Sequence, residues 1–93
     1  MTLNDAERQA QELRVKCEKL RDFCKLEGGV SPMLLPAVKG MVNEELALRE
    51  SIADAGVDES GSAKLMDDLQ QIAFIRQGFE ELIEQALKGQ PLH

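Results

Sequence analysis

Residues 3–29 read LNDAERQAQELRVKCEKLRDFCKLEGG, and this stretch predicts the fold. Its apolar side chains recur at spacings that alternate between three and four residues, which is the heptad pattern of a helix that packs against another helix. Asn4 and Glu7 form a capping-box pattern at its start, and Gly28 supplies the glycine that commonly follows a helix. We therefore expect a helix over residues 5–27. The apolar positions are Leu3, Ala6, Ala10, Leu13, Cys17, Leu20 and Cys24.

Two further periodic segments follow the first one. Pro36 cannot occupy a helix interior without losing a hydrogen bond, so we expect a proline-broken first turn at 31–36 and a helix over 36–55. A third apolar stripe predicts a helix over 62–88. Short connections make consecutive helices antiparallel. The sequence therefore predicts an all-α fold, an antiparallel up-down-up three-helix arrangement, in which residues 1–93 form a single helical domain.

The composition argues against catalysis that depends on a histidine side chain. The 93 residues are 43% hydrophobic, which suffices for one core, and the absence of Trp and Tyr makes that core aliphatic. The chain has one histidine, His93, and it has no phosphate-binding loop or nucleophile motif. We therefore expect a protein that is not an enzyme and has no cofactor. A polar start at Met1 and the lack of a long apolar run predict a cytoplasmic protein.

The charge of the chain is unevenly distributed. Residues 1–29 are balanced in acids and bases, so the whole net charge of −6 lies in residues 30–93. An acidic surface repels phosphate backbones and anionic lipid headgroups. This balance predicts a protein partner, one of basic character, and it argues against nucleic acid and membrane as ligands.

Cys17 and Cys24 are the two residues with the most obvious chemistry. They lie seven positions apart on one helix face, which separates their Cα atoms by about 10 Å and excludes a disulfide within a straight helix. The favoured interpretation is that both are small apolar residues in a helix interface. The alternative is redox or metal bridging between two chains.

Carboxylates on the second and third segments raise the possibility of a metal site. Paired acids on facing helices bind divalent metal in all-helical nucleotide pyrophosphohydrolases of the MazG type. Glu44 and Glu45 resemble the start of that pattern, but Ala47 and Leu48 stand where the third acid should follow. Most of the acids on these two segments map to the solvent side of their helices. We expect solvated faces and no metal site, with a metal-dependent all-helical hydrolase as the alternative function.

Four charged residues lie on or beside apolar stripes. Glu45 and Arg49 interrupt the second stripe, and Arg76 lies at the centre of the third with Glu80 beside it. An unpaired buried charge costs several kcal/mol, so these groups must be paired or lie at an edge. Antiparallel pairing about a turn near Glu59 brings Glu45 close to Arg76. Two roles stay open: a cross-helix salt bridge that sets the register, or a polar hot spot that a partner covers.

The apolar surface exceeds what a three-helix core requires. Phe74 lies opposite its own stripe, and Phe23, Val15 and Leu26 lie off the first seam. Several such residues on a small elongated molecule indicate a second interface. We therefore expect a protein-protein interaction module of the adaptor, secretion-chaperone, anti-activator or phage-inhibitor type. It would form a homodimer or a heterodimer, or clasp a partner helix. A structural subunit of a larger assembly is a further alternative.

Overall fold

The computed structural model describes residues 1–26, 28 and 32–89, and for residues 85–89 it describes the backbone only. It confirms the predicted all-α three-helix arrangement, with no strand in the described part of the chain. The predicted boundaries agree with the observed ones to within two residues, although residue 27 and residues 29–31 lie outside the described part. The elements are α1 (Leu3–Leu26), α2 (Leu35–Asp54), a 3₁₀ turn η1 (Glu59–Gly61) and α3 (Ala63–Gly89).

The N-terminus of α1 is capped by Thr2, and the predicted capping box at Asn4 and Glu7 is wrong. The backbone N–H of Asp5 donates to the Thr2 hydroxyl, and the Thr2 N–H donates to the Asp5 carboxylate, each at a distance of 3.2 Å. This reciprocal pair satisfies backbone donors that a helix start leaves free. The hydrogen bonds from Thr2 lower the pKa of Asp5 below its usual value. The helix therefore begins two residues earlier than predicted.

Pro36 lies in the first turn of α2 and does not kink the helix. A first-turn residue has no intrahelical partner for its N–H, so proline loses nothing there. Residues 32–34 form a turn before the helix, and Ser31, at the start of the predicted proline-broken turn, lies outside the described residues. At the other end, Gly56 adopts a φ of 67°, and Val57 N–H donates to the Ile52 carbonyl. A positive φ is the conformation that glycine accepts most readily, which ends α2 and redirects the chain.

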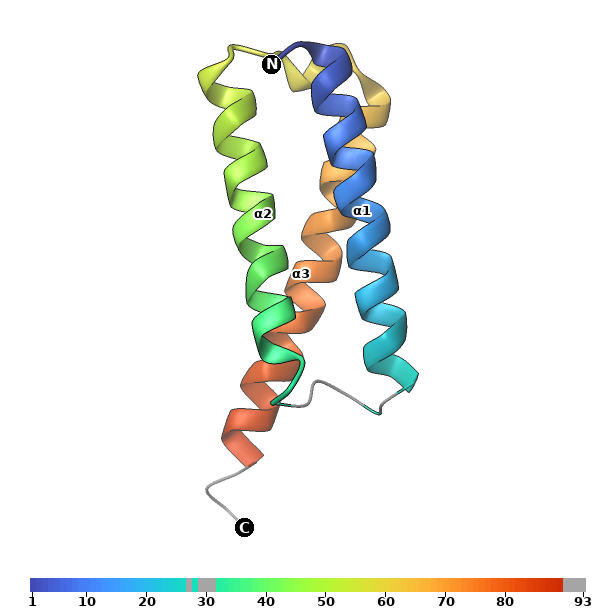
Figure 1. The fold of residues 1–93 in the computed structure, drawn as a ribbon, viewed down its shortest axis with the longest axis vertical. Helices are drawn as coiled ribbons and strands as arrows, with labels where there is room; N and C mark the ends of the chain where they lie inside the picture. The colour runs from blue at the N-terminus through green and yellow to red at the C-terminus, as the bar shows by residue number, and fades with distance from the viewer. Residues whose placement is uncertain (27, 29–31, 90–93) are drawn as a thin grey trace.

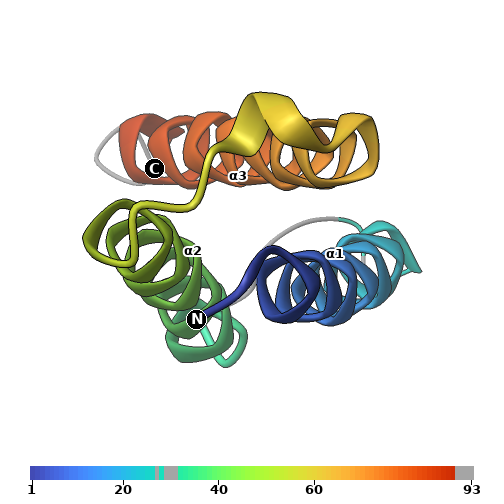
Figure 2. The ribbon, with the colours of Figure 1, turned by 90° about the horizontal axis from the view of Figure 1, so that it is seen from above.

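The three helices form two layers in an elongated molecule. Figure 1 shows α1 descending from the N-terminus, α2 returning beside it, and α3 descending again. Seen from above in Figure 2, α3 forms one layer, and α1 and α2 form the other. The principal extents are 50 × 23 × 18 Å. Because α1 and α3 run in the same direction, their contacts join residues 53 or 54 positions apart, as in the Lys64–Gln11 and Arg14–Asp68 hydrogen bonds.

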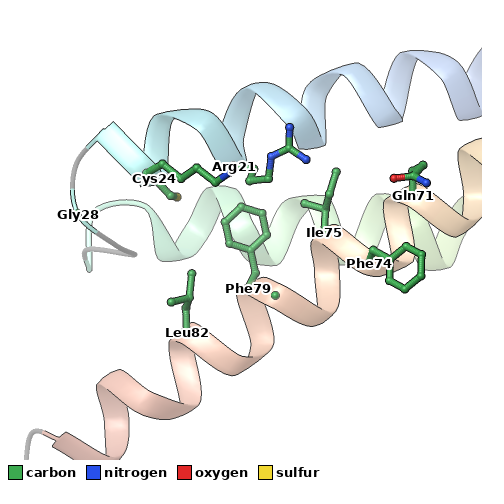
Figure 3. Close-up of a pocket in the computed structure, with 10 residues that line it drawn as sticks. Arg21, Cys24, Gly28, Gln71, Phe74, Ile75, Phe79 and Leu82 are labelled. Atoms are coloured by element: carbon green, nitrogen blue, oxygen red, sulfur yellow. The ribbon is translucent and has the colours of Figure 1, made fainter.

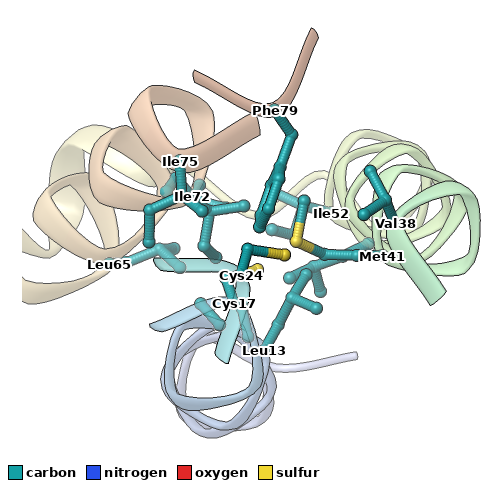
Figure 4. Packing of buried hydrophobic residues seen from close by; sticks show 14 residues of the cluster. Leu13, Cys17, Cys24, Val38, Met41, Ile52, Leu65, Ile72, Ile75 and Phe79 are labelled. Atoms are coloured by element: carbon teal, nitrogen blue, oxygen red, sulfur yellow. The ribbon is translucent and has the colours of Figure 1, made fainter. Parts of the chain in front are cut away.

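The core lies between the three helices and is mostly aliphatic, with side chains from each helix meeting as Figure 4 shows. The seam of α1 is buried as predicted, except that Leu3 and Leu20 are only partly buried. Ala6 and Ala10 are fully buried, so small side chains there let α1 approach its neighbours closely. The largest fully buried side chains are Ile52, Leu65, Ile72, Val38 and Cys17.

Both cysteines are free and buried, as the interface interpretation predicts. Burial raises the pKa of the Cys17 thiol to about 11, and the nearby carboxylates of Glu45, Glu44 and Glu18 add to the effect. Burial also raises the pKa of Cys24. Because the thiolate is the reactive form, burial and the raised pKa of each thiol both disfavour its reaction in the folded protein.

We expect slow reaction of both cysteines with a thiol reagent in the native protein and fast reaction in denaturant. Cys24 should react faster than Cys17, because Cys24 borders a surface groove whereas Cys17 is enclosed by the core. Mass spectrometry of the labelled peptides over time would measure both rates. Native labelling of Cys17 as fast as in denaturant would contradict its place in the core.

Candidate interaction surface

A network of ionic hydrogen bonds joins α2 to α3 around the buried carboxylate of Glu45. Arg76 Nε donates to Glu45 Oε1 at a distance of 2.5 Å, and Arg49 Nε donates to Glu45 Oε2 at 3.1 Å. Arg49 Nη2 also donates to the backbone carbonyl of Leu69, and Arg76 Nη1 donates to Glu80. The structure thus brings together Glu45, Arg49, Arg76 and Glu80, the four charged residues that the apolar stripes single out.

This network links α2 to α3 through the side chains of both helices. The Glu45 side chain is 3% exposed, and each of its oxygens accepts from a different arginine. A buried carboxylate is tolerated only when such charge-assisted bonds satisfy it. A shallow cavity of about 210 Å³ lies beside the network, bordered also by Val42 and Leu46. The guanidinium groups are engaged by carboxylates within the chain, so this cluster offers little free hydrogen-bonding capacity to a ligand.

A second ionic cluster, between α1 and α3, was not predicted. Arg14 Nη1 donates to Asp68 Oδ1 at a distance of 2.7 Å and to Asp67 Oδ2 at 3.2 Å. Arg14 Nε donates to Glu18. Asp68 is an exception among the acids of α3, since its side chain is only 4% exposed. Asp68 lies three residues after Leu65 and four before Ile72, so the apolar stripe of α3 already placed it toward the core.

The predicted apolar excess is present, but its members lie on different parts of the surface. Phe74 is 57% exposed and Phe23 is 48% exposed, and Val15 and Leu26 are also exposed. Of these four, Phe74 borders the most apolar cavity of the described residues, and Phe23 does not line it. The sequence therefore identified exposed aromatic side chains but did not show which of them share a surface.

That cavity is an open groove of about 460 Å³ between the C-terminal half of α1 and the middle of α3, called here the α1/α3 groove. In Figure 3, Ile75, Phe79 and Leu82 point from α3 toward α1, and Cys24 points back from α1. The lining residues are Arg21, Cys24, Lys25 and Gly28 on the α1 side, and Gln71, Phe74, Ile75, Gly78, Phe79 and Leu82 on α3.

The groove arises because α1 ends before α3 does. At the observed offset of 53 or 54 positions, Leu26 at the end of α1 is level with residues 79–80 of α3. Phe79, at that level, is still buried, whereas Leu82, about one turn further along α3, is 42% exposed. Gly78 lies on the groove wall and has nothing within 4 Å of the position that a Cβ atom would occupy. The result is an open, mostly apolar groove that no described side chain fills.

The charges that line the α1/α3 groove are both positive. Arg21 and Lys25 lie one helical turn apart on its α1 side, and no acidic residue is among the described lining residues. Arg21 contacts only its exposed neighbour Asp22 at 3.3 Å among the ion pairs of the described residues. Contacts between exposed groups of this kind contribute little to stability, so Arg21 is available to another partner.

Residues 1–26, 28 and 32–89 contain no group of three or more His, Cys, Asp or Glu side chains placed to hold a metal ion. Over the same residues, no helix has the length and apolar character needed to span a membrane.

Comparisons with protein-family models, with curated proteins and with solved structures give no match to this chain.

Proposed function

We propose that this protein is a non-catalytic helical interaction module whose working surface is the α1/α3 groove, and that the groove receives an amphipathic helix of a protein partner. The observation that carries this proposal is the combination of a 460 Å³ apolar trough with two large exposed side chains, Phe74 and Leu82, at its edges. Grooves of this kind bind the apolar face of a helix in many recognition modules.

The energetics favour such a contact. Fully burying a Phe or Leu side chain contributes about 1.5–3 kcal/mol, and Phe74 and Leu82, at 57% and 42% exposed, have roughly half of that still to gain. Aromatic side chains are also frequent anchors of protein interfaces. The groove wall runs from Gln71 to Leu82 on α3, which is roughly 17 Å at 1.5 Å per residue. That length matches about three turns of a partner helix.

The proposed activity suits an adaptor, a secretion chaperone or an anti-activator in the cytoplasm, each of which works by binding another protein. The two unpaired cysteines are compatible with a reducing compartment. A homodimer and a heterodimer would both use a helix as the occupant of the groove. The Glu45 network, in this proposal, fixes the register of α2 and α3 and takes no direct part in binding.

We expect Gly78→Leu to abolish helix binding without weakening the fold. Among the described residues, nothing lies within 4 Å of the Cβ position of Gly78 on the groove wall, so a leucine there has room to occupy the groove, and it replaces a residue of poor helix propensity. The probe is a synthetic helical peptide of about three turns with leucines along one face and glutamines elsewhere. Nuclear magnetic resonance titration of the labelled protein would map its binding.

The matched control is Gly40→Leu, because Gly40 lies in α2, also has nothing within 4 Å of its Cβ position, and is remote from the groove lining. It should leave peptide binding unchanged. Cys24 offers a second readout, since an occupied groove should slow its labelling while the labelling of Cys17 stays constant. Failure of the peptide to perturb groove residues, or equal binding by Gly78→Leu and Gly40→Leu, would rule out the groove as a helix-binding surface.

A further inference from the structure

We infer that the natural occupant of the α1/α3 groove is an acidic amphipathic helix of another protein, with carboxylates along the edge that faces α1. This inference rests on the proposed function of the groove and specifies the chemistry of its partner. It also departs from the basic partner that the net charge of −6 suggests.

The charge of the groove differs from the charge of the molecule. Arg21 and Lys25 stand on the α1 side, and the described α3 lining residues are all uncharged. A ligand that lies within a few ångströms of two cations responds to those cations more strongly than to distant acids, because salt screens exposed charges beyond about 8–10 Å. Asp22, the acid that contacts Arg21, is exposed and is not among the lining residues, so the two cations are the charges that a bound helix meets in the groove.

The distance between the two cations matches the distance between side chains three or four positions apart along one edge of a bound helix. Arg21 and Lys25 are four residues apart in α1, so their Cα atoms are about 6 Å apart along the helix axis. Carboxylates three or four positions apart on a bound helix have the same separation. One Asp or Glu could therefore face each cation while the apolar side of that helix contacts Phe74, Ile75 and Leu82.

On the α3 side of the groove, opposite Arg21 and Lys25, an acidic residue disfavours a second row of carboxylates on the bound helix. Glu81 is exposed on α3 and lies seven positions, about two turns, after the groove residue Phe74, which places both residues on the same side of that helix. An acid on the edge of the bound helix that faces α3 would meet this like charge. Alanine, glutamine or lysine is expected on that edge, and acids are expected on the edge facing α1.

The contribution of these charges is modest beside that of the apolar contact. Two solvent-exposed ion pairs are expected to increase affinity about fivefold at low ionic strength. They would also increase the rate of association, since complementary charges steer diffusional encounter. Discrimination between partners, more than affinity itself, is what the two cations supply.

Three peptides with the same apolar face test this inference. They carry two Glu, two Gln or two Lys at i and i+4 on one edge, and the labelled protein is titrated with each at low salt. We expect the Glu peptide to bind about fivefold more tightly than the Gln peptide, and the Lys peptide to bind more weakly than both. The Arg21→Glu/Lys25→Glu variant should reverse this order, and high salt should reduce the differences.

The outcomes separate this inference from the proposed function. If the Gln peptide binds in the groove but the three peptides have equal affinities, the groove binds helices and the acidic partner is wrong. If none of the three binds, the proposed function itself is wrong. If the groove residues change with protein concentration in the absence of peptide, the occupant is a second copy of this chain, and the inference is overturned.

Circular dichroism and urea unfolding would check that the variant remains folded. Lys25 is exposed, and the one ion pair that Arg21 forms with a described residue is with its neighbour Asp22. The double change should therefore leave the core intact. The Lys16→Glu/Lys19→Glu variant is the matched control. It makes the same change in net charge on α1 at two exposed lysines that do not line the α1/α3 groove, and it should keep the original order of the three peptides.

Discussion

Removing both arginines that contact Glu45 is expected to lower the free energy of unfolding by about 3–5 kcal/mol. In the Arg49→Ala/Arg76→Ala variant, a carboxylate that is 3% exposed loses the donors to both of its oxygens. The cost is that of leaving a charge buried without compensation, which exceeds the value of the original bonds. Arg76→Ala alone should cost about 1–3 kcal/mol, because Arg49 still donates to Glu45. Urea unfolding followed by circular dichroism would measure both.

The companion variant replaces the whole network by apolar side chains. Glu45→Met/Arg49→Met/Arg76→Met should recover most of the lost stability, since a buried ion pair and an apolar replacement of similar size are often equivalent. Glu80→Ala is the control for the exposed end of the network and should change stability by less than about 0.5 kcal/mol. A double arginine variant as stable as the parent chain would show that Glu45 reaches water in solution.

The three helices could be predicted because local and tertiary preferences agree along the chain. Each apolar stripe has helical period, and glycine or proline interrupts the pattern between consecutive helices. The contact between Glu45 and Arg76 was also accessible, because a short turn between consecutive antiparallel helices restricts their register. The start of α1 was less accessible, since Thr2–Asp5 and Asn4–Glu7 are overlapping candidates for the same cap.

The α1/α3 groove and the Arg14–Asp68 contact depend on a register that no short turn sets. Helices α1 and α3 are parallel and are separated in the chain by the whole of α2. Their relative position follows from side-chain packing, with the small Ala6 and Ala10 allowing close approach, and periodicity alone does not specify it. The point at which α1 stops covering α3 is therefore a property of the assembled core, and so is the surface on which the proposed function depends.

Replacing Arg14 by Met is expected to destabilise the protein by about 2–4 kcal/mol, because it removes the donor to the buried carboxylate of Asp68. Methionine keeps most of the apolar stem of arginine, so the loss reports on the charge and its hydrogen bonds. Asp68 Oδ2 is already buried without a hydrogen-bond partner among the described residues, which leaves this carboxylate dependent on Oδ1 and Arg14.

Two comparisons isolate the buried part of the Arg14 cluster. Asp67→Asn and Glu18→Gln remove the more exposed acceptors of the same guanidinium and should each change stability by less than about 0.5 kcal/mol. Arg14→Met/Asp68→Leu should be more stable than Arg14→Met alone, because the buried carboxylate of Asp68 is then removed as well. Additive losses for Arg14 and Asp68 in this double-mutant cycle would mean that the two residues do not interact in solution. The parallel register of α1 and α3, and with it the shape of the α1/α3 groove, would then have to depend on the apolar contacts alone.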